Sequence, residues 1–229
     1  SPGGSSVASD VILRELQLTK KDDPDRPIVV SMSDLAASGG YYIALAGDEI
    51  VAQPGTLTGS IGIYTGKIVY RGTLEKVGIT AEPVISGANA DMYSPLSTFT
   101  PPQRQKVEAF MRDFYNGFLD KTAESRNKTR EEVHQLAQGR VWTGEQAKER
   151  GLVDRVGGLN DAIDVVKERA EIGAGEAVEV VVYPRRRTFY EAFSDQFGGG
   201  ADGVGLLRAI TGAHGPARAV AAATAPGRL

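Results

Sequence analysis

Cysteine is absent from this 229-residue chain, and histidine occurs only twice. The chain therefore has no disulfide, no thiolate nucleophile and no thiolate metal ligand. Its 26 basic and 29 acidic residues leave a net charge of −3, so the basic surface typical of nucleic-acid binding is not expected. No apolar run approaches the length of a membrane span, so the chain itself is expected to be soluble. The sequence also has no metal-ligand cluster, phosphate loop or nucleotide fingerprint, and we expect no cofactor.

Short apolar runs alternate with segments whose apolar residues recur at helical spacing, a pattern typical of an α/β fold. The part from about residue 100 to 172 is predicted to be mostly helical. Helices are expected over residues 6–21, 39–46, 70–78 and 100–126, from Thr129 onward, and over 143–151 and 159–171, whereas strands are expected over 27–32, 49–52, 60–64, 79–85 and 178–182, with a loop over 87–98.

The sequence divides into a domain over residues 1–184 and a tail over residues 185–229. The tail is rich in glycine and alanine, and we expect it to be partly mobile or to dock on a partner. Within it, Arg185–Arg187 are interpreted as solvated surface or, less strongly, as a contact for anionic lipid headgroups. Residues 1–5 form a glycine turn of the kind that normally follows a strand, so upstream strands of the fold are expected to be missing.

Ser38 stands in the run Ala-Ser-Gly-Gly, between a predicted buried strand and a predicted helix. A serine hydroxyl becomes a good nucleophile when a neighbouring base removes its proton and backbone N–H groups stabilise the oxyanion. Gly39 and Gly40 allow a substrate backbone to approach closely, and the glycine turn at residues 2–4 can lend another N–H donor. The alternative is that Ser38 only caps the helix, since serine is a common N-cap residue.

The general base is harder to find. His134 lies on a charged helical face and His214 lies in the tail, so both are interpreted as surface residues and a Ser-His-Asp triad is not expected. The remaining candidate is a lysine whose pKa is lowered from about 10.4 toward neutrality by burial. The residues therefore favour a serine nucleophile with a lysine base.

Four sequence blocks follow one another along the chain: SPGG at residues 1–4, SMSDLAASGGYY at 31–42, LTGSIG at 57–62 and GRVWTG at 139–144. Together they resemble the signal peptide peptidase A (protease IV) family of bacterial serine peptidases, and the match runs to about residue 170. The resemblance implies a crotonase-like fold shared with Clp protease, a superhelix of strand–strand–helix repeats with a helical C-terminal extension. It further implies a Ser-Lys dyad that degrades signal-peptide remnants left in the membrane.

The resemblance also implies roles for individual residues. Ser38 matches the nucleophile, Gly3 lies in the turn that lends one oxyanion N–H, and Gly39 can lend another. Ser60 matches a second serine that hydrogen-bonds the lysine ammonium and holds it in place. The plainer interpretation of Ser60 is a turn serine.

One position departs from the pattern of the short, single-domain members. Their general-base lysine falls in the segment that matches residues 86–95, where this chain has Ala90. Either the chain resembles the C-terminal half of a double-length member, whose N-terminal copy of the fold carries the lysine, or a lysine at position 90 has been replaced. We favour the first, so the base is expected from an N-terminal domain of the same parent chain or from another subunit. Lys67 is the fallback base within the chain, although a solvated lysine is its plainer interpretation.

Peptide substrates are expected to bind in extended form beside residues 61–65, with a small or aliphatic side chain in an apolar pocket near Ser38. The resemblance implies a ring- or dome-shaped homo-oligomer, and a parent protein at the bacterial inner membrane that faces the periplasm. The residues expected at the pocket, each of which would also fit the core, are Met32, Leu35, Tyr41 and Tyr42.

Two other functions compete with a peptidase. An acyl-CoA enzyme on the same fold would need a positioned carboxylate in place of the serine, and the intact blocks around Ser38 and Ser60 argue against it. A non-catalytic scaffold or binding module stays open because position 90 holds alanine.

Overall fold

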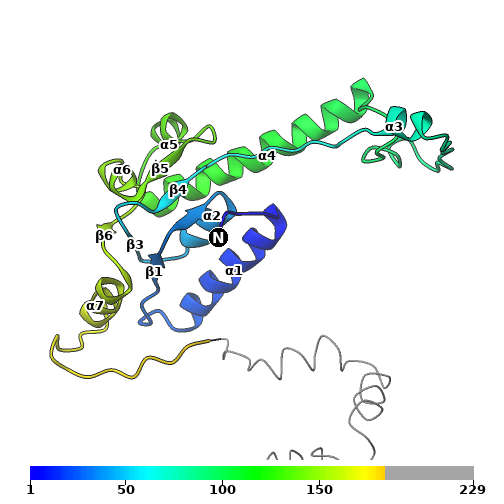
Figure 1. Ribbon diagram of the computed structural model, residues 1–229. Coiled ribbons are helices and arrows are strands. Elements are labelled where there is room, and N and C mark those ends of the chain that lie inside the picture. Colours follow the sequence, from blue (N-terminus) through cyan, green and yellow to red (C-terminus); the bar gives the residue numbers. More distant parts are fainter. Residues whose placement is uncertain (184–229) are drawn as a thin grey trace, which may run out of the picture. The chain divides into compact units, whose positions relative to one another are not determined.

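A computed structural model describes residues 1–183 of the chain (Figure 1). The chain divides into two units, Ser1–Glu176 and Ala177–Leu229. Described residues 177–183 of the second unit contain no strand, so the strand expected over 178–182 is wrong. The predictions for Arg185–Arg187, His214 and the tail lie outside the described residues.

The strands of the first unit form two small sheets, and the α/β class predicted from the sequence is confirmed. The first sheet is parallel and has the order β1 (Val29–Met32), β3 (Glu49–Ala52), β6 (Arg155–Val156). In the second sheet, β2 (Leu35–Ala37) pairs in parallel with β4 (Leu57–Gly59), and β4 pairs antiparallel with β5 (Val141–Thr143). The strands β2, β5 and β6 were not expected, since runs of two or three residues carry too little pattern to detect.

The helices agree closely with the sequence prediction. Thr100, Thr129 and Thr143 each cap a helix and form a capping box with the glutamine or glutamate three residues later. These caps fix where α4, α5 and α6 begin. The bounds are α1 (Ser6–Asp22), α2 (Gly39–Ala44), α3 (Arg71–Lys76), α4 (Pro101–Arg126), α5 (Arg130–Leu136), α6 (Gly144–Glu149) and α7 (Leu159–Arg169).

The core forms where α1, α2 and the C-terminal half of α4 meet the strands. Tyr41 is fully buried, and its hydroxyl donates to the Leu152 carbonyl at 2.8 Å. Burial raises the pKa of Tyr41, so this phenol stays protonated as a donor. The largest buried side chains are those of Leu13, Tyr41, Ile50, Ile61, Phe118 and Leu152.

A buried ion pair fastens the end of α4 to this core. The guanidinium of Arg126 contacts both carboxylate oxygens of Asp154, at 2.9 Å from Nη1 and 2.5 Å from Nη2, and its side chain is only 7% exposed. Asp154 also accepts from the Ile50 N–H at 2.8 Å. Burial alone would raise the pKa of Asp154, but the hydrogen bonds from Arg126 and the Ile50 N–H, together with the nearby positive charges, outweigh it and hold that pKa below its usual value.

Residues 64–100, called the arm below, leave this core. Figure 1 shows the chain leaving β4 and running beside α4 to α3, near the N-terminal end of α4. The arm exposes large apolar side chains, among them Tyr64 (95% exposed) and Ile68 (81%). The strands expected over 60–64 and 79–85 are wrong: neither segment forms a strand, although both have a β-forming composition. The loop expected over 87–98 is confirmed.

Candidate active site

Ser38 lies at the turn between β2 and α2. Its φ of 52° falls in a region that residues other than glycine rarely adopt, at a cost of about 1–3 kcal/mol, and such strain persists only where surrounding contacts hold it. Here the Ser38 N–H donates to the Gly59 carbonyl at 2.9 Å, and its carbonyl accepts from the Tyr42 N–H at 2.8 Å. Ser38 occupies the N-cap position of α2, yet its side chain makes no capping hydrogen bond. Its hydroxyl is therefore not committed to holding the helix.

Ser60 occupies the equivalent place on the neighbouring strand. The register of the parallel pair β2–β4 joins Ala37 to Gly59, so Ser38 and Ser60 follow at the same end of the two strands. Ser60 also has a positive φ, of 50°, and its N–H donates to the Arg140 carbonyl at 2.7 Å. The fold thus brings together two strained serines that lie far apart in the sequence.

Gly3 packs directly on the Ser38 turn. The Ser1 carbonyl accepts from the Ala37 N–H at 3.0 Å, so the N-terminal segment lies alongside β2. Gly3 has a φ of 99°, and a Cβ there would lie 2.8 Å from both the Gly39 nitrogen and the Ser38 Cβ. Only glycine fits this position. The Gly3 and Gly39 backbones therefore lie together beside Ser38.

Sequence reasoning missed what supports Ser60. The antiparallel pairing of β4 with β5 continues past Gly59, because the Gly139 N–H donates to the Ile61 carbonyl at 3.0 Å. A Cβ on Gly59 would lie 2.9 Å from Trp142, so the two segments are in close contact. The block at residues 139–144 carried the signal, but its role as the partner of the Ser60 segment depends on a pairing between distant residues.

Lys67, the fallback base, is engaged within the arm. Its Nζ donates to the Met92 carbonyl at 2.8 Å and lies 4.5 Å from the centre of the Phe99 ring. These contacts hold the ammonium of Lys67 on two other residues of the arm.

Ala90 lies in an exposed turn of that loop, close to the start of α4. The neighbouring Asp91 accepts from the Gln103 side chain at 2.8 Å. At 1.5 Å per residue, Gln103 lies about 16 Å along α4 from Phe114, whose ring stacks on Tyr42 in the helix that follows Ser38. A side chain at position 90 is therefore remote from the Ser38 of its own chain.

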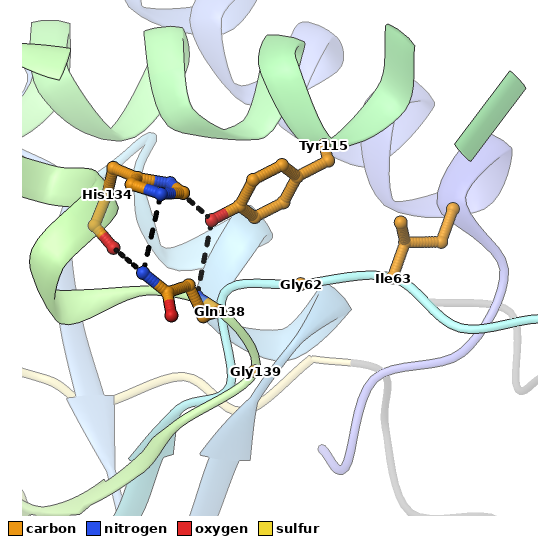
Figure 2. Close-up of a pocket in the computed structure, with 6 residues that line it drawn as sticks. All are labelled: Gly62, Ile63, Tyr115, His134, Gln138 and Gly139. Atoms are coloured by element: carbon orange, nitrogen blue, oxygen red, sulfur yellow. Dashed lines mark hydrogen bonds between the residues drawn. The ribbon is translucent and has the colours of Figure 1, made fainter. Parts of the chain in front are cut away.

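His134 is exposed, as predicted, but its ring is held in a network. Its Nδ1 lies 2.9 Å from the Tyr115 hydroxyl, and its Nε2 lies 3.3 Å from Gln138 Nε2 (Figure 2). These side chains line a cavity of about 320 Å³ together with Gly62, Ile63 and Gly139.

A second cavity, of about 380 Å³, lies between α1, α2 and α4, beside the start of the Ser38 helix. Among the residues predicted to form an apolar pocket, only Tyr42 lines it; Tyr41 and Met32 are core residues. The Tyr42 hydroxyl donates to Asp10 at 2.6 Å, and burial together with this contact raises the pKa of Tyr42. The cavity is lined by Ser6, Val7, Asp10, Val11, Tyr42, Phe110, Asp113, Phe114 and Gly117.

Comparison with known proteins gives a consistent result. Residues 20–173 match Peptidase family S49. The chain is 39% identical over 220 residues to the chloroplastic serine protease SPPA of Arabidopsis thaliana, with 92% of this chain and 32% of that protein covered. It is 40% identical over 172 residues to protease 4 of Salmonella typhi, with 75% and 27% covered. The chain thus spans about a third or less of the length of these curated relatives.

Among solved structures, the chain is similar to a mutant of a membrane-bound stomatin-specific protease. The TM-score is 0.41 with 19% sequence identity, over 70% of this chain and 62% of the other.

Proposed function

The chain belongs to peptidase family S49, and on that premise we propose that it carries the serine half of a peptidase active site, with Ser38 as the nucleophile. One observation carries the proposal: Ser38 and Ser60 both have a positive φ and follow at the same end of two paired strands. Strain of this kind is typical of functional sites, where neighbouring structure holds it.

In the proposed reaction a neutral lysine removes the proton from Ser38 Oγ, which attacks the carbonyl carbon of the scissile peptide bond. The oxyanion accepts hydrogen bonds from the backbone N–H groups of Gly3 and Gly39. The lysine ammonium, held by the Ser60 hydroxyl, then protonates the leaving amine. Water hydrolyses the acyl-enzyme with the same lysine as base, which restores the Ser38 hydroxyl.

We propose that this lysine comes from outside the chain, either from an N-terminal copy of the fold in the same parent protein or from another subunit. Lys67 is bound to Met92, and the turn that holds Ala90 lies at the far end of α4 from the Ser38 helix. Neither position supports a base acting on the Ser38 of the same chain. A lysine restored at position 90 would, on this proposal, serve a neighbouring copy.

The exposed apolar side chains of the arm support assembly into a homo-oligomer or with a second domain. Surfaces of this kind are typical of contacts with another protein. Side chains such as Tyr64 and Ile68 are nearly fully exposed on a segment that leaves the core.

The substrates we propose are peptides, and signal-peptide remnants in particular, cleaved after small or aliphatic residues. The cavity beside Tyr42 supports this, because its lining is largely apolar and lies one helical turn from Ser38. Among residues 1–183, no helix is long and apolar enough to cross a bilayer. We propose that the parent protein acts at a membrane, at the periplasmic face if it is bacterial, although a chloroplast protein is among the relatives.

Labelling with a fluorophosphonate probe tests the proposal. The probe forms a covalent bond with an activated serine, and we expect it to label Ser38 when the chain is joined to upstream sequence or mixed with a partner that supplies lysine, but only weakly in the chain alone. Ser38→Ala should abolish labelling, and Ser33→Ala, at an exposed serine nearby, should leave it unchanged.

A non-catalytic binding module is the second candidate function, favoured by the alanine at position 90. Peptide binding without labelling of Ser38 in any assembly would support it. Strong hydrolysis by the chain alone, lost in Ser38→Ala, would instead show that the base lies within these 229 residues.

A further inference from the structure

The cavity around His134 holds a hydrogen-bond network that the proposed peptidase mechanism does not use. It lies along the segment that continues from Ser60, because Gly62, Ile63 and the adjacent Gly139 line one side of it, across from Tyr115 and His134 (Figure 2). Two residues of extended chain span about 7 Å, so this wall begins within that distance of Ser60. The cavity is therefore within reach of a peptide that runs along residues 61–65.

The orientation of Gln138 fixes the first part of the network. Its Nε2 lies 3.2 Å from the His134 carbonyl, which can only accept, so the atom there must be the amide nitrogen. The same nitrogen lies 3.3 Å from His134 Nε2. Since the amide nitrogen only donates, His134 Nε2 must be an acceptor, and the ring proton sits on Nδ1.

Two donors then converge on the Tyr115 hydroxyl oxygen. One is the His134 Nδ1–H at 2.9 Å, and the other is the backbone N–H of Gln138 at 3.3 Å. Gln138 has a φ of 62°, a strained conformation for a residue with a side chain. With its oxygen accepting twice, the Tyr115 hydroxyl keeps its own proton, and no acceptor for that proton is found among the residues that the structure describes.

We propose that this cavity is a second side-chain subsite of the peptide cleft, in which the Tyr115 hydroxyl donates to a carbonyl oxygen of a substrate glutamine or asparagine. This inference rests on the proposed function. An amide fits because its carbonyl accepts from Tyr115. The selected residue lies within about three positions of the scissile bond, given the spacing from Ser60.

Binding of uncleavable complexes tests the subsite independently of catalysis. In a Ser38→Ala background, isothermal titration with paired peptides that carry glutamine or leucine at each position should reveal one position where glutamine binds about five- to tenfold tighter, as for one neutral hydrogen bond. Tyr115→Phe should abolish that preference and leave the affinity of the leucine peptide within about twofold. Tyr93→Phe, the same change at an exposed tyrosine of the loop before α4, should preserve it.

Nitrogen-15 NMR of the His134 ring provides a second readout. The network predicts the Nδ1–H tautomer for this ring. An Nε2–H ring in the unmodified chain, or no glutamine preference at any position, would overturn the subsite. If the preference is found but Ser38 is never labelled, the subsite stands and the peptidase proposal fails. Cleavage without any preference would leave the peptidase proposal standing and remove the subsite.

Discussion

The Ser38 turn and the arm differ in how the rest of the chain packs against them. Around Ser38 the backbone is strained, and every part of it is held by another segment of the same chain: Gly59 accepts from Ser38, and the Ser1–Gly3 segment packs along β2. The arm instead carries apolar side chains such as Tyr64 and Ile68 that nothing in the described chain covers. The packing is therefore complete around the nucleophile and incomplete around the arm.

This contrast bears on our proposal that the general base comes from outside the chain. The turn with Ala90 belongs to the incomplete region, whereas both serines belong to the complete one. An active site divided as we propose would need an assembly to bring its two parts together. Substitutions in each region, taken in decreasing order of effect, can show whether the two differ as much as their packing indicates.

Gly3→Ala is expected to have the largest effect. The new Cβ would meet backbone and the Ser38 side chain at 2.8 Å, at a φ of 99° that alanine rarely adopts. We expect hydrolysis by the assembled peptidase to fall by about 10²–10³, as for loss of one oxyanion donor, and the free energy of unfolding to fall by about 2 kcal/mol or more. Steady-state kinetics and urea denaturation measure the two.

Gly66→Ala is the matched control in the arm. A Cβ at Gly66 would meet nothing within 4 Å, so both quantities should stay nearly unchanged, with the unfolding free energy within about 0.5 kcal/mol. Equal losses in the two variants would break the comparison, because they would mean that the arm is packed as tightly as the Ser38 turn.

The sequence predicted the complete region better than the incomplete one. The helices there begin at threonine caps such as Thr129 and Thr143, and a cap is a local signal. The serines were found because their blocks are specific, but the pairing that unites Ser38 with Ser60 needs β2, a strand of three residues. Such a strand exists only through its partners, so its own residues give no periodic pattern.

The two strands expected in and just before the arm failed for a related reason. Residues 60–64 and 79–85 have the composition of strands, yet in the described chain only Ser60 and Ile61 find backbone partners on a neighbouring segment, which is too few for a strand. Composition shows only that a segment can form a strand when a neighbouring strand is present to pair with it. The wrong predictions therefore fall in the same region as the uncovered apolar side chains.

Asp154→Asn should have the next largest effect, on stability alone. It leaves the buried guanidinium of Arg126, 7% exposed, without its counter-charge. Breaking a buried pair costs about 3–5 kcal/mol, and because a third of Asp154 is exposed we expect a loss of about 2–3 kcal/mol in the free energy of unfolding. Asp120→Asn breaks an exposed pair with Arg130 and should cost less than about 1 kcal/mol. Similar losses in the two variants would mean that the buried pair does not stabilise the core.

The same pair predicts a pH dependence. Against the effect of burial, the hydrogen bonds from Arg126 and the Ile50 N–H and the nearby positive charges together hold the pKa of Asp154 below its usual value. The carboxylate therefore contributes stability above its unfolded pKa, about 3.9, and loses it as the pH falls through the lower folded value. The difference in unfolding free energy between the unmodified chain and Asp154→Asn should be constant above about pH 5 and shrink below about pH 4. Urea denaturation from about pH 7 to about pH 3 measures it. A difference that grows on acidification would reverse the assigned direction.

Ile68→Ala in the arm should have the smallest effect on the isolated chain. Ile68 is 81% exposed, so truncation removes little buried surface and should change the free energy of unfolding by less than about 0.5 kcal/mol. The same substitution at Ile50, which is fully buried, should cost about 2–4 kcal/mol. Sedimentation experiments measure assembly, and there Ile68→Ala should have the larger effect of the two. It should weaken assembly, because the arm gains its contacts only from a partner. If Ile68→Ala destabilises the isolated chain as much as Ile50→Ala does, the arm packs on its own fold, and the base must be sought within the chain.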